Sequence, residues 1–398
     1  MRRNRRVTPE GTRDLLFEEC LARREAEGRL TDLFVRRGFS EVMTPGIEFY
    51  DVFHADSMAI PAESMYKLSD DKGRLLVMRP DSTMPIARLA GARLQQAPLP
   101  LRLYYAQDVF HLNHGMTGHN DQEFQAGIEL IGAGGQRADL EVLALAADAL
   151  AESGCGDFRL EIGHVGFFHA LVKELGVGEE EQDEIRSLVE SKNYAALGDA
   201  LDALPESDAV VALRRLPRLF GGEEVLEAAQ PLCMTPQMKD ALRYLVELYE
   251  GLCALGLSDQ VMIDLGLVHR NEYYTGVIFR GYIEGSGETV VSGGRYDTLL
   301  EKFGRPLPAT GFGVNVDALT KVMLDSGLVD PPMPPEVLVY AAPGFEIAGL
   351  KKVSELTGEG LICEYGVFDR LEPTLRYAEE KQISKVIAVG ETIEVYEL

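Results

Sequence analysis

A short run of prolines near residue 330 restricts the architecture of this chain more than any other sequence feature. The segment Asp330-Pro331-Pro332-Met333-Pro334-Pro335 holds four prolines within five residues. Proline fixes its own φ and has no backbone N–H to donate, so the run favours an extended backbone and cannot lie inside a helix or a sheet. We therefore expect residues 326–335 to form a linker between a core over residues 1–325 and a second domain over residues 336–398.

The segment after the linker alternates apolar strands with helices. Strands are expected at Val337–Ala341, Leu361–Tyr365 and Val386–Val389, and helices at Glu346–Leu356 and Leu371–Lys381. Short apolar strands that alternate with helices are typical of sheets covered by helices. This order predicts a small, mostly parallel α/β domain.

The core before the linker is expected to combine helices with strands. Apolar residues at helical spacing predict a helix within residues 14–37, and strands are expected at residues 74–79 and 101–110. Between about residues 170 and 258, acidic blocks rich in Ala and Leu alternate with Pro and Gly, which indicates a helical insertion. Strands resume at Gln260–Asp264.

Five segments of the core, taken together and in order, resemble the motifs of class II histidyl-tRNA synthetases. They are Thr8-Pro9-Glu10-Gly11-Thr12-Arg13-Asp14, Arg79-Pro80-Asp81-Ser82-Thr83, Gln125-Ala126-Gly127-Ile128-Glu129, Tyr273-Tyr274-Thr275-Gly276 and Gly293-Gly294-Arg295-Tyr296-Asp297. The resemblance spans residues 8 to about 319. It implies an α+β fold, with an antiparallel sheet flanked by helices and the helical insertion between the third and fourth segments. The last domain resembles the synthetase's anticodon-binding domain, truncated because it stops at Leu398.

The same resemblance implies a histidine pocket. Its residues would be Asp81, Thr83, Gln125, Glu129, Tyr273 and Tyr274. The first three would surround the α-ammonium, Glu129 and Tyr274 would bind the imidazole, and Tyr273 would line the pocket. A carboxylate and a tyrosine hydroxyl suit the two ring nitrogens of an imidazole. The synthetases usually have glutamate at the position of Asp81, so the reach of this anion differs here. Each residue alone is more simply explained as a structural polar group, whereas the ordered set favours a pocket.

Other residues stand at the positions where the resemblance implies arginines for activating the amino acid. Adenylation builds negative charge on phosphate oxygens, which arginines and magnesium stabilise. The resemblance implies arginines after the second-motif strand, in the third-motif helix and before the paired tyrosines. Those positions hold His111, Ala318 and His269, although Arg270 adjoins the last. The third-motif helix is expected at residues 311–319. The loop from His111 to Glu123 has no Lys or Arg, so we expect no catalytic residues and no cofactor.

A metal site in this loop is a weaker interpretation. His111, His114 and His119 lie close together in the sequence, but on a polar, glycine-containing loop. They lack the helical or CxxC framing that zinc sites usually have. We expect a solvated loop and no metal.

Charge and cysteine usage narrow the possible partners. The net charge is −25, and residues 336–398 hold twelve Asp or Glu against six Lys or Arg. Proteins that bind nucleic acids usually need basic faces, which makes tRNA an unlikely partner. The five scattered cysteines have no CxxC pair, the basic residues at positions 2–6 are not followed by an apolar stretch, and no apolar run has the length of a membrane span, so we expect no secretory signal. These features predict a cytoplasmic location without membrane contact.

A histidine pocket without adenylation arginines is similar to the regulatory subunits of ATP phosphoribosyltransferase. Membership of that family implies a non-catalytic subunit in the first step of histidine biosynthesis. It also implies three partners: a short-form catalytic subunit that requires this chain for activity, a second copy of the chain within a hetero-oligomer, and L-histidine as feedback regulator. Two alternatives remain open, an active but divergent histidyl-tRNA synthetase and a synthetase-like regulator that senses tRNA.

Overall fold

The chain divides into two compact units, which we name unit 1 (Met1–Val329) and unit 2 (Asp330–Leu398). The computed structural model describes residues 6–54, 60–113, 120–268 and 273–398. The proline-rich residues 330–335 form neither helix nor strand. Within the described ranges, no helix has the length and apolar character needed to cross a membrane.

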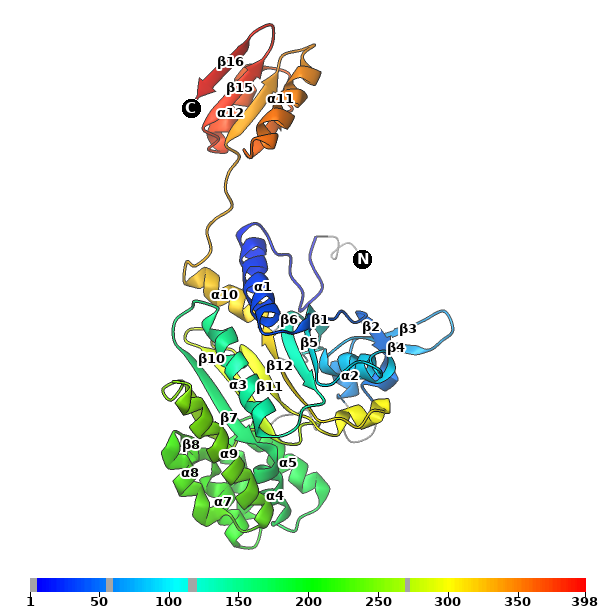
Figure 1. Ribbon diagram of the computed structural model, residues 1–398, viewed down its shortest axis with the longest axis vertical. Coiled ribbons are helices and arrows are strands. Elements are labelled where there is room, and N and C mark those ends of the chain that lie inside the picture. Colours follow the sequence, from blue (N-terminus) through cyan, green and yellow to red (C-terminus); the bar gives the residue numbers. More distant parts are fainter. Residues whose placement is uncertain (1–5, 55–59, 114–119, 269–272) are drawn as a thin grey trace. The chain divides into compact units, whose positions relative to one another are not determined.

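Unit 1 is built on a large mixed sheet (Figure 1). The described strands run in the order β1-β5-β6-β12-β11-β10-β7-β9-β8. Neighbouring strands are antiparallel except for the pairs β1–β5 and β7–β9. In sheet order the strands are β1 (Ser40–Glu41), β5 (Leu101–Phe110), β6 (Gln122–Ile131), β12 (Ala309–Asn315), β11 (Val291–Arg295), β10 (Val277–Ile283), β7 (Phe158–His164), β9 (Val261–Asp264) and β8 (Phe220–Gly221). A second, smaller sheet joins β2 (Ile47–Phe49), β4 (Leu75–Met78) and β3 (Lys67–Ser69).

The two faces of the large sheet differ in what covers them. Helices α1 (Glu18–Arg36), α3 (Gln136–Ala151) and α10 (Val316–Asp325) pack on one face and share an apolar core with strand residues such as Ile128. The other face packs in part against α2 (Thr83–Ala92). Because alternate residues of a strand point to opposite faces, polar side chains that avoid the helical core collect on the α2 face.

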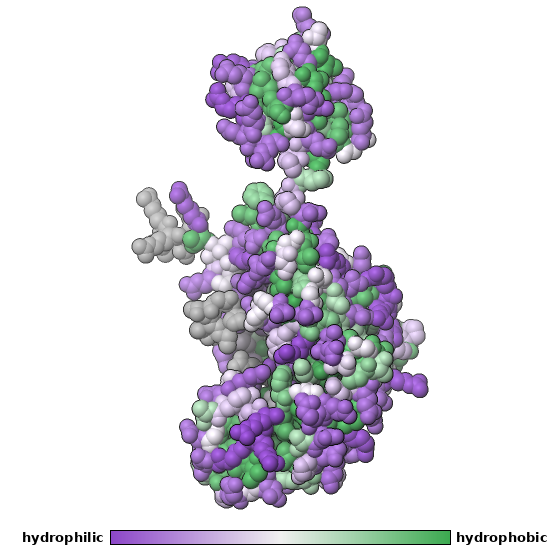
Figure 2. Space-filling model, turned by 90° about the vertical axis from the view of Figure 1, so that its left-hand side faces the viewer, coloured by the Kyte–Doolittle hydropathy of each residue, from purple (hydrophilic) through white to green (hydrophobic). Residues whose placement is uncertain are grey.

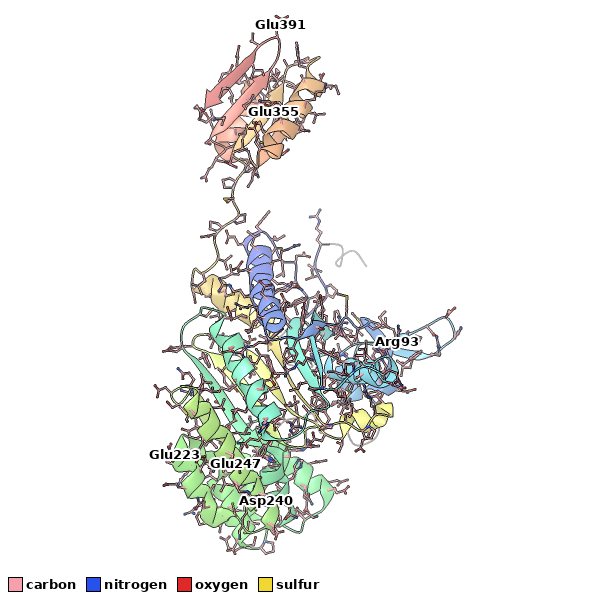
Figure 3. The ribbon with its side chains drawn as sticks, viewed as in Figure 1. Arg93, Glu223, Asp240, Glu247, Glu355 and Glu391 are labelled. Carbon is pink, nitrogen blue, oxygen red and sulfur yellow. The ribbon has the colours of Figure 1, made fainter. Side chains whose placement is uncertain are left out.

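A helical insertion separates β7 from β9 (Figure 1). Its helices are α4 (Val165–Lys173), α5 (Glu179–Glu190), α6 (Tyr194–Asp202), α7 (Asp208–Arg215), α8 (Glu223–Ala229) and α9 (Pro236–Ala254). Helix α9 starts with a cap, since the side chain of Thr235 accepts a hydrogen bond from the Met238 N–H at 3.2 Å. The surface of the insertion is acidic, and Figure 3 shows the exposed Glu223 and Asp240 on α8 and α9.

A buried ion pair fixes strand β11 against two helices. The Arg295 Nε donates to the Asp139 carboxylate on α3 at 2.9 Å, and the hydroxyl of Tyr244 on α9 donates to the same carboxylate at 2.6 Å. Arg295 is 5% exposed and Asp139 is fully buried. Because Tyr296 follows Arg295 directly, this network also sets the position of Tyr296 on the opposite face.

The prediction of a helix over residues 311–319 is wrong for residues 311–315. Ala309–Asn315 forms strand β12, and the helix α10 begins only at Val316. The Asn315 side chain accepts a hydrogen bond from the Ala318 N–H at 2.8 Å and so caps α10. Glycines at 311 and 313 have little preference for a helix, and pairing with β6 decides their conformation. Ala318 therefore lies in the first turn of α10.

Unit 2 is a small α/β domain, as expected. Its described strands run in the order β14-β13-β15-β16, with β13 parallel to β14 and β15 and with β16 antiparallel at the edge. Helices α11 and α12 cover opposite faces. The bounds are β13 (Val337–Ala341), α11 (Glu346–Gly358), β14 (Cys363–Gly366), α12 (Leu371–Glu380), β15 (Lys385–Val389) and β16 (Ile393–Glu397). On both units, hydrophilic residues cover most of the face seen in Figure 2.

Candidate functional site

A cavity of about 400 Å³ lies on the α2 face of the large sheet, and we name it the tyrosine cavity. All six residues expected from the sequence line it. They come from the start of α2, from β6 and from the segment before β10, which are far apart in the sequence. The residues are Asp81, Thr83, Gln125, Glu129, Tyr273 and Tyr274. Their common cavity brings them within reach of one small ligand.

Strand β6 supplies two of these side chains from one face. Gln125 and Glu129 are four residues apart, so both point into the cavity. Glu129 pairs with Gly311 of β12, whereas Gln125 pairs with Asn315 and its side chain lies over Gly313. A Cβ atom at Gly313 would lie 2.8 Å from the side-chain amide carbon of Gln125, and one at Gly311 would overlap the Glu129 carboxylate. The two glycines therefore provide the space that these side chains occupy.

The Asp81 carboxylate makes one contact with the start of α2 and another with a residue that lines the tyrosine cavity. Its Oδ1 accepts a hydrogen bond from the Met84 N–H at 2.8 Å, which caps the helix. Its Oδ2 accepts one from the Tyr273 hydroxyl at 3.4 Å. Burial raises the pKa of Asp81 to about 6, although these hydrogen bonds counteract part of the rise. The helix cap alone would explain an aspartate here, but the second oxygen remains directed at the cavity.

Glu129 is the most deeply buried carboxylate of the cavity. It is 2% exposed, and its Oε2 accepts a short hydrogen bond from the Tyr296 hydroxyl. Burial raises the pKa of Glu129 to about 8, with hydrogen bonds from Tyr296 and Thr83 acting against the rise and the charge of Asp81 adding to it. Without a ligand, the Glu129 carboxyl therefore keeps its proton to a large extent near neutral pH.

Two tyrosines of the cavity were not among the residues expected from the sequence. The Tyr105 hydroxyl on β5 donates to the Gln125 Oε1 at 2.8 Å, and Tyr296 contacts Glu129. Tyr296 lies within the fifth of the family-like segments, so its motif could have identified it. Tyr105 carries no such signal, because its place opposite Gly127 depends on the register of β5 against β6.

The charge of the tyrosine cavity favours a cationic ligand. Its described lining includes the carboxyl groups of Asp81, Glu123 and Glu129 and no Lys or Arg. Tyrosine rings add aromatic surface, with the ring centroids of Tyr273 and Tyr274 4.7 Å apart. A protonated amine would lower the pKa values that burial has raised, and the tyrosine faces suit a flat or cationic group.

A neighbouring cavity of about 560 Å³ shares four lining residues with the first, and we name it the α10 cavity. The shared residues are His111, Asn113, Glu123 and Asn315. Ala318 lines the α10 cavity but not the tyrosine cavity. Two of the three positions expected to lack synthetase arginines, His111 and Ala318, thus meet there, while His269 lies outside the described residues.

The α10 cavity is a poor site for a polyphosphate. Its described lining has two basic side chains, Arg13 and Lys321, against the five acidic side chains of Glu19, Glu123, Glu288, Asp317 and Asp325. Burial, together with Asp317 and Glu288, raises the pKa of Glu123 to about 7, and burial lowers the pKa of His111. A lowered pKa keeps the His111 imidazole neutral near pH 7, so it offers no positive charge to phosphate oxygens.

The histidines considered for a metal site are only partly described. His114 and His119 lie outside the described residues. Elsewhere, in the part of the chain that the structure covers, no three or more His, Cys, Asp or Glu side chains are grouped as metal ligands. All five cysteines are free thiols.

Comparison with known proteins gives consistent matches over both units. A model of the histidyl-tRNA synthetase family matches residues 11–319. An ATP phosphoribosyltransferase regulatory subunit of Clostridium novyi is 36% identical over 399 residues, covering 99% of this chain and 95% of that protein. A solved structure from Bacillus halodurans, described as an ATP phosphoribosyltransferase regulatory subunit/histidyl-tRNA synthetase, has a TM-score of 0.84 and 32% identity, covering 98% of this chain and 99% of that one. Histidyl-tRNA synthetase from Nostoc sp. PCC 7120 has a TM-score of 0.76 at 20% identity, covering 98% and 94%, and supports the same fold. The α+β, class II synthetase-like fold expected from the sequence is confirmed.

Proposed function

The chain belongs to the histidyl-tRNA synthetase-like family of ATP phosphoribosyltransferase regulatory subunits, and on that basis we propose that it binds L-histidine in the tyrosine cavity and thereby controls a catalytic partner. Its function is regulatory, in histidine biosynthesis. The name of its relatives implies a catalytic ATP phosphoribosyltransferase subunit as the partner. We propose that this partner is the short form and that it needs this chain for activity. We also propose that histidine bound to this chain inhibits the catalytic subunit as a feedback regulator. Such control requires histidine to bind one state of the complex more tightly than the other.

The residues that line the tyrosine cavity are the main support for this proposal. Asp81, Thr83 and Gln125 would receive the α-ammonium, because two of them offer oxygen acceptors next to a buried carboxylate. Glu129 and Tyr274 would receive the two imidazole nitrogens, with Tyr273 beside them. A volume of about 400 Å³ is within the range of small-molecule sites.

We further propose that the chain performs no adenylation. The lining of the α10 cavity supports this proposal, because it includes His111 and Ala318, two positions where the resemblance to the synthetases implies arginines, and has more acidic than basic side chains. The acidic insertion and the acidic unit 2 also make tRNA an unfavourable ligand, since phosphate contacts need basic faces. Unit 2, which we propose to correspond to an anticodon-binding domain after the linker, would then serve in packing or contact with proteins.

Self-association is part of the proposal. Strand β1 is an edge of the large sheet, and an exposed edge favours pairing with another chain. Large apolar side chains are exposed on α1, on β2 and in the segment between them, which is typical of a contact surface. They are Leu21, Val35, Met43, Ile47 and Phe49. We propose that this region joins two copies of the chain into a homodimer within the hetero-oligomer, in the cytoplasm.

Histidine binding is expected to be tightest near pH 7 and weaker on both sides. The imidazole of free histidine has a pKa of about 6.5, and the pKa of Glu129 in the empty cavity is about 8. Between these values the pair holds the single proton that a Glu129–imidazole hydrogen bond needs. Below about pH 6 one proton must leave, and Asp81, with its pKa of about 6, also becomes neutral beside the ammonium. Above about pH 8 one proton must be taken up, so Kd should rise up to about tenfold per pH unit.

Calorimetric titration of the full chain with L-histidine at pH values from about 5.5 to 9 measures this profile. The variant Glu129→Gln is the control, because it removes the titrating group and should abolish the rise in Kd between about pH 8 and 9. A Kd that stays constant from the acidic to the alkaline end would contradict the assigned role of Glu129. Absence of histidine binding to the chain and to its complex with the catalytic subunit would contradict the proposed function itself.

A further inference from the structure

A third cavity, of about 830 Å³, lies where the large sheet meets the helical insertion. It shares no lining residue with the tyrosine cavity or the α10 cavity. Its lining comes from β7, from the residues just before β9, from the end of β10 and from Lys192, which follows α5. We name it the insertion cavity.

Strand register places polar side chains together at this cavity. Glu161 of β7 pairs with Arg280 of β10, and Arg159 pairs with Tyr282. Directly paired residues of adjacent strands point to the same face. The neighbouring Leu160 and Ile162 belong to the helical core, so Glu161 and Arg159 point to the opposite face.

Glu161 is buried, and one of its carboxylate oxygens makes no hydrogen bond to the described residues. The side chain is 6% exposed, and its Oε2 has no hydrogen-bond partner among the described residues. The Gln260 Oε1 in the same cavity also lacks one there. Burial raises the pKa of Glu161, and the charge of Lys192 counteracts only part of that rise. Because more than about 90% of buried polar groups in native proteins are paired, two unpaired acceptors that line one cavity indicate a missing donor.

The other side chains of the cavity define the chemistry of that donor. Asp157, Asp259 and Glu284 join Glu161 on the acidic side, while Arg159 and Lys192 are the basic members of the described lining. The excess of carboxylates favours a cationic nitrogen, and the two basic side chains can hold an anionic group on the same molecule. A volume of about 830 Å³ accommodates a small ligand.

We propose that the insertion cavity is a second ligand site, which takes a small molecule with a protonated amine or guanidinium that donates to Glu161 and Gln260. A carboxylate on the same molecule would meet Lys192 and Arg159, so free basic amino acids have the matching chemistry. This site is independent of the role proposed for the tyrosine cavity. Because the insertion connects β7 to β9, a ligand there would bridge the insertion and the sheet.

Binding of L-arginine, L-lysine and methylammonium to the full chain tests the proposal by calorimetry. The same titrations with Glu129→Gln separate this site from the tyrosine cavity, since binding here should survive that change. Glu161→Gln is expected to weaken L-arginine or L-lysine binding at least about tenfold, as loss of a charge-assisted hydrogen bond does. Glu284→Gln, an exposed residue of the same cavity, is the matched control and should change Kd less than about twofold. Methylammonium should bind more weakly than the amino acids, because it lacks the carboxylate.

Three results would overturn the proposal. The first is that none of the probes binds at concentrations up to about 10 mM, and the second is that Glu161→Gln and Glu284→Gln bind them equally. The third comes from the unliganded chain at pH 8. There, Glu161→Gln should raise the melting temperature, because the neighbouring positive charges offset only part of the cost of burying the carboxylate, whereas a lower melting temperature or a loss of self-association would assign Glu161 a structural role.

Discussion

Replacing Glu129 with glutamine is expected to weaken L-histidine binding at least about 100-fold, which corresponds to about 2.7 kcal/mol. The carboxyl is 2% exposed and held by Tyr296, so it cannot be replaced by a neighbouring group or by bulk water. An amide cannot accept the imidazolium proton or carry the charge that the bound pair shares. The amide can still make a neutral hydrogen bond to a ligand nitrogen, but such a bond is roughly half as strong as a charge-assisted one.

Calorimetric titration at pH 7 measures this effect. Glu288→Gln is the matched control, because Glu288 lines the α10 cavity and not the tyrosine cavity. It should leave Kd for histidine within about twofold of the unmodified chain. If Glu129→Gln bound histidine with unchanged affinity, the imidazole would have to bind elsewhere, and the assignment of the tyrosine cavity would fail.

ATP–pyrophosphate exchange with L-histidine is the second large effect, and we expect none above background. One preorganised donor aimed at a developing negative charge contributes about 10²–10³ in rate. If, as we propose, His111 and Ala318 occupy the positions of two such donors, the rate should be at least about 10⁴ lower than that of an active histidyl-tRNA synthetase assayed alongside. The acidic lining of the α10 cavity also weakens binding of ATP before any chemistry.

Exchange that depends on both histidine and ATP would contradict this expectation and favour an active but divergent synthetase. Filter binding with tRNA addresses the other alternative, a tRNA-sensing regulator. The net charge of −25 predicts binding that disappears at physiological salt.

Local sequence signals were sufficient to predict much of the fold. Strand β13 has the expected bounds, Val337–Ala341, and α11 begins at the expected Glu346. Apolar runs next to Gly and Pro mark such elements without knowledge of the rest of the chain. Strand β16 was not predicted, because Ile393 and Val395 are 59% and 55% exposed and no buried face marks the strand. Residues 311–315 were placed in a helix because their pairing with β6 is a contact between segments far apart in the sequence.

The tyrosine cavity was predictable only to the extent that its residues lie in family-like segments. Asp81, Glu129 and Tyr274 could be named from such segments, whereas Tyr105 could not, because its contact with Gln125 depends on strand register. The insertion cavity had no sequence signal at all. Glu161 looks like any charged residue in a strand, and only the fold shows that it is buried with one carboxylate oxygen that makes no hydrogen bond to the described residues.

The central claim, that histidine acts through the tyrosine cavity on a catalytic partner, is tested most directly by reconstitution. The short-form ATP phosphoribosyltransferase subunit is assayed alone, with this chain and with Glu129→Gln, over a range of L-histidine concentrations. We predict that the chain raises the catalytic rate and that histidine lowers the rate of the complex. The Glu129→Gln complex should keep the raised rate but need about 100-fold more histidine for the same inhibition. Equal sensitivity of the two complexes to histidine, or a catalytic subunit that is fully active and inhibited on its own, would contradict the claim.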